Sequence, residues 1–187
     1  MTHTQKWNNE ADETVSTYDD GTVSKREWYQ NGVLHREDGP AVIKYREDGS
    51  VWYVLWYQNG VLHRVDGPAT IRYCPDGTVK SERWCRDGQT HREEGPAVIY
   101  YRLRRGSVER EEWFRDGELT RADGPALINY YQDGSRGEFW YNHGKLHRED
   151  GPAEIFYRPD GSVESEDYFL DGEALTEEEF KASKANN

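Results

Sequence analysis

The sequence repeats one phrase at nearly constant intervals. Residues 31–41 read NGVLHREDGPA, and residues 59–69 read NGVLHRVDGPA. The Gly-Pro-Ala that ends the phrase recurs in five places, beginning at positions 39, 67, 95, 124 and 151. A fixed period of this length is typical of repeat proteins, in which each unit contacts only its neighbours. The sequence therefore predicts a single repeat domain over residues 14–175, with five units of 27–29 residues between two half-units.

Between the glycines, side chains alternate with a period of two. In AVIKY, we expect Ala41, Ile43 and Tyr45 on one face of a strand, and Val42 and Lys44 on the other. Such segments alternate with a second kind that ends at a Trp, and Asp-Gly or Pro-Asp-Gly separates the two, as in tight hairpins. The pattern predicts an all-β fold, an open, twisted, antiparallel meander of about twelve short strands that forms a β-hairpin solenoid.

The two ends of the chain lack the repeat. Residues 1–13 show no periodicity, and we expect a flexible N-terminal segment there. Residues 176–187 begin with Thr176, and Glu179 follows at the spacing of a capping box. We expect a short helical cap or tail over the last strand, because repeat arrays need atypical ends for solubility.

The repeated phrase carries a ladder of charged loop residues, for which two interpretations remain open. In the structural one, Arg pairs with a nearby acidic residue and His caps loop carbonyls, which fixes the register between units. In the binding one, the loops present a row of donors to an anion such as a phosphate or a partner's carboxylates. The loop ladder comprises His35, Arg36, Asp38, His63, Arg64, Asp66, His91, Arg92, Glu94, Arg121, Asp123, His147, Arg148 and Asp150.

A second candidate surface combines aromatic and acidic residues. A Trp lies four residues before the loop Gly of each unit, and in the later units a Glu lies two residues before the aromatic position. We expect like charges to stack along the sheet, at a cost in stability that a binding role would explain. The alternative is a solvated strand end that discourages edge aggregation. This acidic-aromatic strip comprises Trp28, Trp56, Trp84, Trp113, Trp140, Glu82, Glu111, Glu138 and Glu166.

The repeat argues against catalysis and metal binding. Equivalent residues of successive units would lie about 9–10 Å apart, too far for the His residues to share one metal ion. No Ser or Cys nucleophile recurs, so we predict no catalytic residue, no enzyme activity, no metal site and no cofactor. A formal charge of −12 argues against direct nucleic-acid binding.

Two cysteines, Cys74 and Cys85, flank one predicted hairpin without facing each other, so a disulfide is not expected. Neither a signal peptide nor a long apolar run is evident. We expect a protein without a membrane role in a reducing cytoplasm, that of a bacterium or of an infected host cell.

An aromatic residue, then Asn-Gly-x-Leu-His, then a strand ending in Tyr and a further Asp-Gly, resembles the MORN-repeat variant family, which includes YwqK-type antitoxins of bacteria and repeat proteins of phages and giant viruses. The resemblance covers roughly residues 15–175. It implies an extended sheet of β-hairpins that acts by binding and carries no catalytic residue. The His-Arg-x-Asp-Gly-Pro-Ala loop departs from the usual pattern, so a lipid or membrane role does not carry over.

Together, these features predict a non-enzymatic scaffold that binds and neutralises a protein partner, as an antitoxin, an immunity protein or a phage inhibitor does. One alternative is a small-molecule sponge that holds nucleotides or similar anions between adjacent repeats. Another is a purely structural spacer. Exposed strand edges at the two ends of the sheet would also allow a homodimer.

Overall fold

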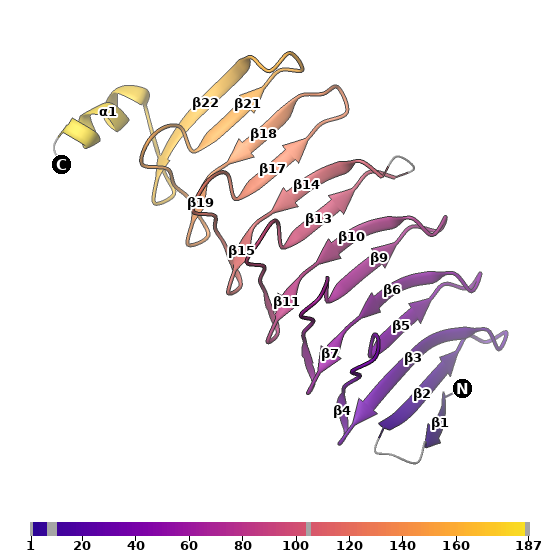
Figure 1. Cartoon of the computed structure of the whole chain (residues 1–187). Coiled ribbons are helices and arrows are strands. Elements are labelled where there is room, and N and C mark those ends of the chain that lie inside the picture. The colour runs from indigo at the N-terminus through magenta and orange to yellow at the C-terminus, as the bar shows by residue number, and fades with distance from the viewer. Residues whose placement is uncertain (1, 7–10, 104–105, 186–187) are drawn as a thin grey trace. The chain divides into compact units, whose positions relative to one another are not determined.

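The computed structural model describes residues 2–6, 11–103 and 106–185 and shows an antiparallel β-meander (Figure 1). The strands of the main sheet follow one another in the order β1-β2-β3-β5-β6-β9-β10-β13-β14-β17-β18-β21-β22-β23. The order has two ends, so the sheet is open, and twelve strands lie between β1 and β23. The predicted open all-β meander is confirmed.

The chain divides into two compact units, and the boundary runs through β13. The N-terminal unit comprises Met1–His91 and Tyr100–Ser107, and the C-terminal unit comprises Arg92–Ile99 and Val108–Asn187. The strands up to the boundary are β1 (Thr2–Lys6), β2 (Ala11–Thr17), β3 (Val23–Gln30), β4 (Val33–Leu34), β5 (Val42–Tyr45), β6 (Val51–Leu55), β7 (Tyr57–Gln58), β8 (Val61–Leu62), β9 (Thr70–Tyr73), β10 (Val79–Arg83), β11 (Cys85–Arg86), β12 (Gln89–Thr90) and β13 (Val98–Tyr101). The elements after it are β14 (Val108–Glu112), β15 (Phe114–Arg115), β16 (Glu118–Leu119), β17 (Leu127–Tyr130), β18 (Arg136–Phe139), β19 (Tyr141–Asn142), β20 (Lys145–Leu146), β21 (Glu154–Tyr157), β22 (Val163–Leu170), β23 (Glu173–Leu175) and α1 (Glu177–Ala185).

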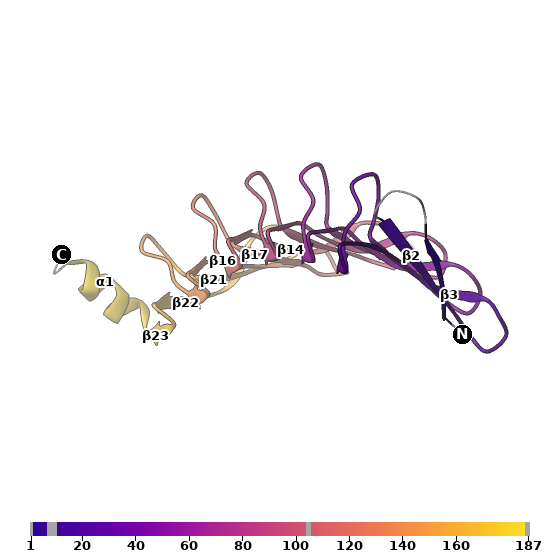
Figure 2. The same cartoon turned by 90° about the horizontal axis from the view of Figure 1, so that it is seen from below.

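Two kinds of turn set the strand order. In one kind, an Asp side chain accepts a hydrogen bond from the backbone two residues later, as Asp48 does from the N–H of Ser50 at 2.8 Å. In the other kind, both central residues have positive φ, as in Asn59 (51°) and Gly60 (81°). This is the geometry of a two-residue type I′ hairpin, which explains the recurring Asn-Gly and Asp-Gly pairs. In each unit, the loops that link successive strands rise as a row from one side of the strands (Figure 2).

The strand register sorts side chains onto two faces. In the N-terminal unit, Ile43 lies opposite Val54, which lies opposite Ile71, so these residues share a face. In the C-terminal unit, Ile128 and Ile155 occupy the same row. We call the face that carries these residues the isoleucine face. The alanines that end the repeated phrase, two residues before these isoleucines, are fully buried: Ala41, Ala69, Ala97, Ala126 and Ala153.

Backbone hydrogen bonds also join each short hairpin to the preceding one. The Gly60 N–H donates to the Leu34 carbonyl at 2.9 Å, and the Arg36 N–H donates to the Tyr57 carbonyl at 3.2 Å. The same two bonds recur in the C-terminal unit, from Gly172 to Leu146 and from Arg148 to Phe169. Within each unit, neighbouring repeats are therefore held by the main sheet and by this second set of bonds.

The N-terminal segment differs from the prediction. Residues 2–6 and 11–17 form β1 and β2, and β2 pairs with β3 along most of its length. The pairing partner, rather than any periodicity of its own, gives this segment its strand structure. The rest of the predicted flexible segment, residues 1 and 7–10, lies outside the described residues.

The predicted C-terminal helix is α1, and its capping box is confirmed. The Thr176 N–H donates to Glu179 Oε2 at 2.8 Å, and the Glu179 N–H donates to Thr176 Oγ1 at 3.2 Å. Phe180 is 7% exposed, and its ring centroid lies 4.9 Å from that of Tyr168 on β22. The helix therefore covers the aromatic residue that ends the series of tryptophans.

Candidate binding groove of the C-terminal unit

The loop ladder is built around an arginine stacked on a tryptophan. The Arg36 guanidinium carbon lies 4.1 Å from the ring centroid of Trp28, at the distance of a cation–π contact. A Cβ on Gly39 would lie 3.1 Å from the same carbon, so a larger residue there would displace the guanidinium by a few tenths of an ångström. The arrangement recurs for Arg64 on Trp56 at 4.0 Å, Arg121 on Trp113 at 4.2 Å and Arg148 on Trp140 at 4.1 Å.

The donors of these arginines are used within the loop. Arg36 Nε donates to Asp38 at 2.8 Å, and Arg148 Nε donates to Asp150 at 2.7 Å. In both loops Nη1 points at the proline carbonyl four residues on. These hydrogen bonds hold the pKa of Asp38 and Asp150 below the usual value for aspartate. The predicted Arg–Asp pairing is confirmed for these two loops, and it leaves fewer donors for an external anion.

The histidines act differently from the prediction. His35 Nδ1 accepts a hydrogen bond from the Asn59 N–H at 3.1 Å, and His147 Nδ1 accepts one from the Asp171 N–H at 3.0 Å. His63 accepts the equivalent bond from Asp87 at 3.2 Å. Each ring therefore caps an N–H of the next hairpin, not a loop carbonyl, because a hairpin with two positive φ values exposes an N–H there. The histidines of the loop ladder therefore link each repeat to the next one.

The acidic-aromatic strip is not a continuous free surface. Four of its tryptophans stand under arginines, as described above. Glu82 accepts a hydrogen bond from the Tyr101 hydroxyl at 2.7 Å, and Glu111 accepts one from Tyr130 at 2.9 Å. Glu138 accepts one from Arg136 Nε at 2.9 Å. The remaining glutamate, Glu166, is exposed.

The expected stacking of like charges along this column is wrong. Ile71 lies opposite Glu82, and in the C-terminal unit Ile128 separates Glu111 from Glu138. An isoleucine therefore stands between successive carboxylates, about two strand spacings apart. The Tyr130 hydroxyl shows the effect of this packing, because burial and its bond to Glu111 raise its pKa to about 12. These glutamates contribute to the packing of the isoleucine face.

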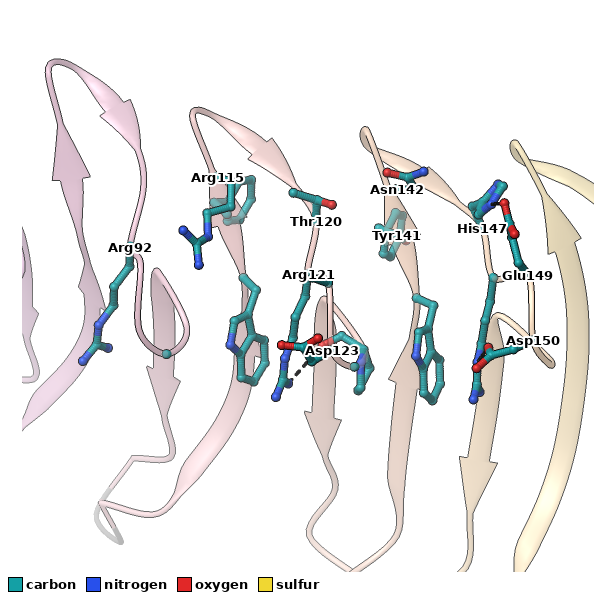
Figure 3. Close-up of a pocket in the computed structure, with 18 of the residues that line it drawn as sticks. Arg92, Arg115, Thr120, Arg121, Asp123, Tyr141, Asn142, His147, Glu149 and Asp150 are labelled. Carbon is teal, nitrogen blue, oxygen red and sulfur yellow. Dashed lines mark hydrogen bonds and ion pairs between the residues drawn. The ribbon is translucent and has the colours of Figure 1, made fainter.

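Described residues of the C-terminal unit form a groove of about 1300 Å³. Three stretches of the loop ladder contribute to it, at residues 92–95, 120–125 and 147–150. Figure 3 shows Arg92 and Arg121 extending from successive loops, with the acidic Asp123 beside Arg121 and Asp150 in the following loop. Arg148 of that loop also lines the groove. We call this surface the loop groove. It contains aromatic rings, guanidinium groups and carboxylates in alternation.

Several residues of the loop groove were not singled out from the sequence. Arg115, Tyr141 and Asn142 belong to short hairpins, and Arg115 donates to the Glu93 carbonyl at 2.6 Å. These residues lie one or two positions after the Trp of their repeat, where the residue type differs between copies. The position directly after the Trp, for example, is Cys85, Phe114 or Tyr141 in three copies. A search for residues shared by all copies passes over them, and variation at a fixed repeat position was the available signal.

Comparisons with known proteins leave the family open. No protein-family model matches the chain, and no curated protein matches it. The resemblance to MORN-repeat variants therefore stays a prediction. No helix in the described part of the chain has the length and apolar character needed to cross a bilayer.

Proposed function

We propose that this protein is a non-enzymatic scaffold that binds a protein partner in the loop groove, as antitoxins, immunity proteins and phage inhibitors bind theirs. The observation that carries the proposal is a groove whose walls come from three successive loops. Each of two loops is fixed by an arginine stacked between an indole and a glycine, namely Arg121 and Arg148. Such preformed walls reduce the entropy lost on binding.

The dimensions of the loop groove suit an extended polypeptide segment. Three equivalent loops, each about 9–10 Å from the next, span about 20 Å, which corresponds to about six residues in β conformation. The walls offer guanidinium groups and carboxylates in turn, so a segment of mixed charge would find complementary groups along its length. The carboxylates of Glu93, Asp123, Glu149 and Asp150 disfavour a phosphate-rich ligand in the same place.

The free thiols Cys74 and Cys85 support a reducing location, such as the cytoplasm of a bacterium or of an infected host cell. Both are buried, and burial raises the pKa of the Cys85 thiol. A thiol with a raised pKa is a poor nucleophile, which fits a structural role in a binding protein.

Affinity capture with a matched pair of variants tests the proposal. Arg115 lines the loop groove. Arg86 holds the same position, two residues after the Trp, in the preceding repeat and does not line the loop groove. We expect wild type and Arg86→Glu to capture the same protein from the native host. Arg115→Glu combined with Tyr141→Ala should weaken binding of the purified partner at least 10-fold, about 1.4 kcal/mol.

Two results would refute the assignment. Equal loss of the partner with Arg86→Glu would place the contact outside the loop groove. In calorimetric titration with a panel of nucleotides, tight uptake of several molecules per chain would instead identify a small-molecule sponge. Circular dichroism of each variant shows whether a loss of binding follows from a loss of structure.

A further inference from the structure

The face opposite the isoleucine face is basic in the N-terminal unit, although the chain as a whole carries a formal charge of −12. Lys25 lies opposite Lys44, and Tyr53 lies opposite Arg72 on the next strand. Arg83 lies opposite Thr70 and shares the face with Arg72. We call this surface the basic face. It comprises Lys25, Lys44, Trp52, Tyr53, Arg72 and Arg83.

The cations of the basic face are only partly neutralised. Glu27 forms an ion pair with Lys25 at 2.9 Å, and the Lys44 ammonium lies 5.0 Å from the ring centroid of Trp52, which is 44% exposed. Arg72 and Arg83 are exposed, and within the described ranges no residue forms a hydrogen bond or an ion pair with either guanidinium group. Two guanidinium groups on neighbouring strands are therefore available to a partner.

The corresponding face of the C-terminal unit carries the Arg110–Glu112 ion pair on β14 and is acidic over β21 and β22. Glu154 on β21 lies directly opposite Asp167 on β22. Like charges in this position destabilise a sheet. Burial and the charge of Asp167 both raise the pKa of Glu154. Within residues 11–103 and 106–185 neither carboxylate has a cationic partner, and the exposed Glu164 lies in the β-bulge of the same strand pair. We call Glu154, Glu164 and Asp167 the acidic face.

We infer that the protein self-associates, with the basic face of one copy bound to the acidic face of a second copy. The two surfaces have complementary charge. Glu154 and Asp167 lie directly opposite each other on adjacent strands, about 5 Å apart. Arg72 and Arg83 lie diagonally on adjacent strands, about 7–8 Å apart, a difference that the long arginine side chains can span. Two guanidinium groups over the two carboxylates would relieve the repulsion within the acidic pair.

A second copy of the chain is a better occupant than a nucleic acid, because a second copy accounts for both the basic face and the acidic face. A polyanion on the basic face would leave the repulsion between Glu154 and Asp167 unexplained, and the other charges of this acidic chain would repel it. Both faces carry aromatic pairs: Phe139 and Phe156 stack edge to face at 5.7 Å beside the acidic face, and Trp52 and Tyr53 of the basic face are tilted against each other at 5.4 Å. These residues do not discriminate between the two occupants.

Charge reversal with exchange of partners tests this contact. Light scattering after gel filtration at low salt should give wild type a mass of at least two chains of 21.9 kDa, which falls to that of one chain in 1 M NaCl. Arg72→Glu with Arg83→Glu should yield single chains, and so should Glu154→Lys with Asp167→Lys. An equimolar mixture of these two variants should again give an assembly, and so should one chain that carries all four changes.

The controls separate specific contact from net charge. Arg72→Glu alone changes the charge by as much as Lys145→Glu does, and Lys145 is exposed on a hairpin. Only the first should weaken association. A wild type that is a single chain at low salt up to high protein concentration, or two reversed variants that do not combine, would overturn the proposal. Tight binding of a fluorescent single-stranded oligonucleotide, lost in the Arg72 and Arg83 variant, would assign the basic face to nucleic acid instead.

Discussion

Replacing Gly67 by alanine tests the stacked arginine directly. A Cβ at this position would lie 2.9 Å from the Arg64 guanidinium carbon, closer than real Cβ atoms approach other atoms. The backbone of Gly67 does not have positive φ, so alanine adds no strain of that kind. The side chain of Arg64 would have to leave its place above Trp56 and give up its bond to the Pro68 carbonyl at 3.1 Å.

The magnitude follows from these contacts. The cation–π contact contributes about 1 kcal/mol at a partly exposed site, the hydrogen bond about 1 kcal/mol, and a displaced rotamer costs about 0.5–1.5 kcal/mol. Alanine recovers about 0.4–1 kcal/mol by restricting the unfolded chain. We therefore expect Gly67→Ala to lower the free energy of unfolding by about 2 kcal/mol in urea denaturation followed by far-ultraviolet circular dichroism.

A double-mutant cycle isolates the cause. In an Arg64→Ala background the guanidinium is absent, so Gly67→Ala should be neutral or slightly stabilising, which gives a coupling energy of about 2–3 kcal/mol. Gly151→Ala should cost less than Gly67→Ala, because its Cβ would lie 3.3 Å from the Arg148 carbon. Equal costs of Gly67→Ala with and without Arg64 would refute the close approach as the reason for glycine.

Three further outcomes are expected. Phe180→Ala should lower the local stability of β22 and β23 by about 3 kcal/mol, measured by hydrogen exchange, whereas Phe180→Leu should retain most of it; unchanged exchange would show that α1 does not cap the sheet. Because the pKa of Tyr130 is about 12 in the folded chain and about 10 when unfolded, its contribution to stability is present below pH 10 and lost between pH 10 and 12. The difference in absorbance at 295 nm between wild type and Tyr130→Phe should show that Tyr130 ionises near pH 12, and in Glu111→Gln it should ionise at a lower pH. Hydrogen bonds from Ser50, Ser135 and Ser162 lower the pKa of Asp48, Asp133 and Asp160, so their stabilisation is present above about pH 4 and lost below it; a triple Ser→Ala variant should unfold at higher pH on acidification, and an unchanged acid midpoint would contradict this.

The fold could be predicted because its turns are chemically local. Asn59-Gly60 specifies a hairpin without reference to the rest of the chain, and Thr176 with Glu179 specifies a helix start in the same way. Strand β1 had no such local signal, because it forms by pairing with β2. The strand structure of the N-terminus therefore could not be read from its sequence alone.

The candidate site was less predictable because its contacts join residues of neighbouring repeats. The role of His35 depends on an N–H of Asn59, 24 residues ahead, so a single copy of the phrase does not reveal it. Gly39 precedes Pro40, where glycine relieves the restriction that proline places on its predecessor. In the structure a Cβ at Gly39 would also lie 3.1 Å from the Arg36 guanidinium carbon, a contact that its sequence neighbours do not reveal. The residues that differ between copies, such as Arg115 and Tyr141, line the loop groove.

The way the final hairpin ends has a consequence for how such a chain can lengthen. Leu175 and Thr176 stand at the positions of His35 and Arg36 in the first copy, and Phe180 packs on Tyr168 where a copy such as the one before it places a guanidinium on an indole. The last hairpin lacks the arginine, and α1 covers Tyr168 instead. Engineered duplication or removal of a whole repeat should therefore be tolerated better upstream of β22, where every copy supplies an arginine at this position, than between β22 and α1.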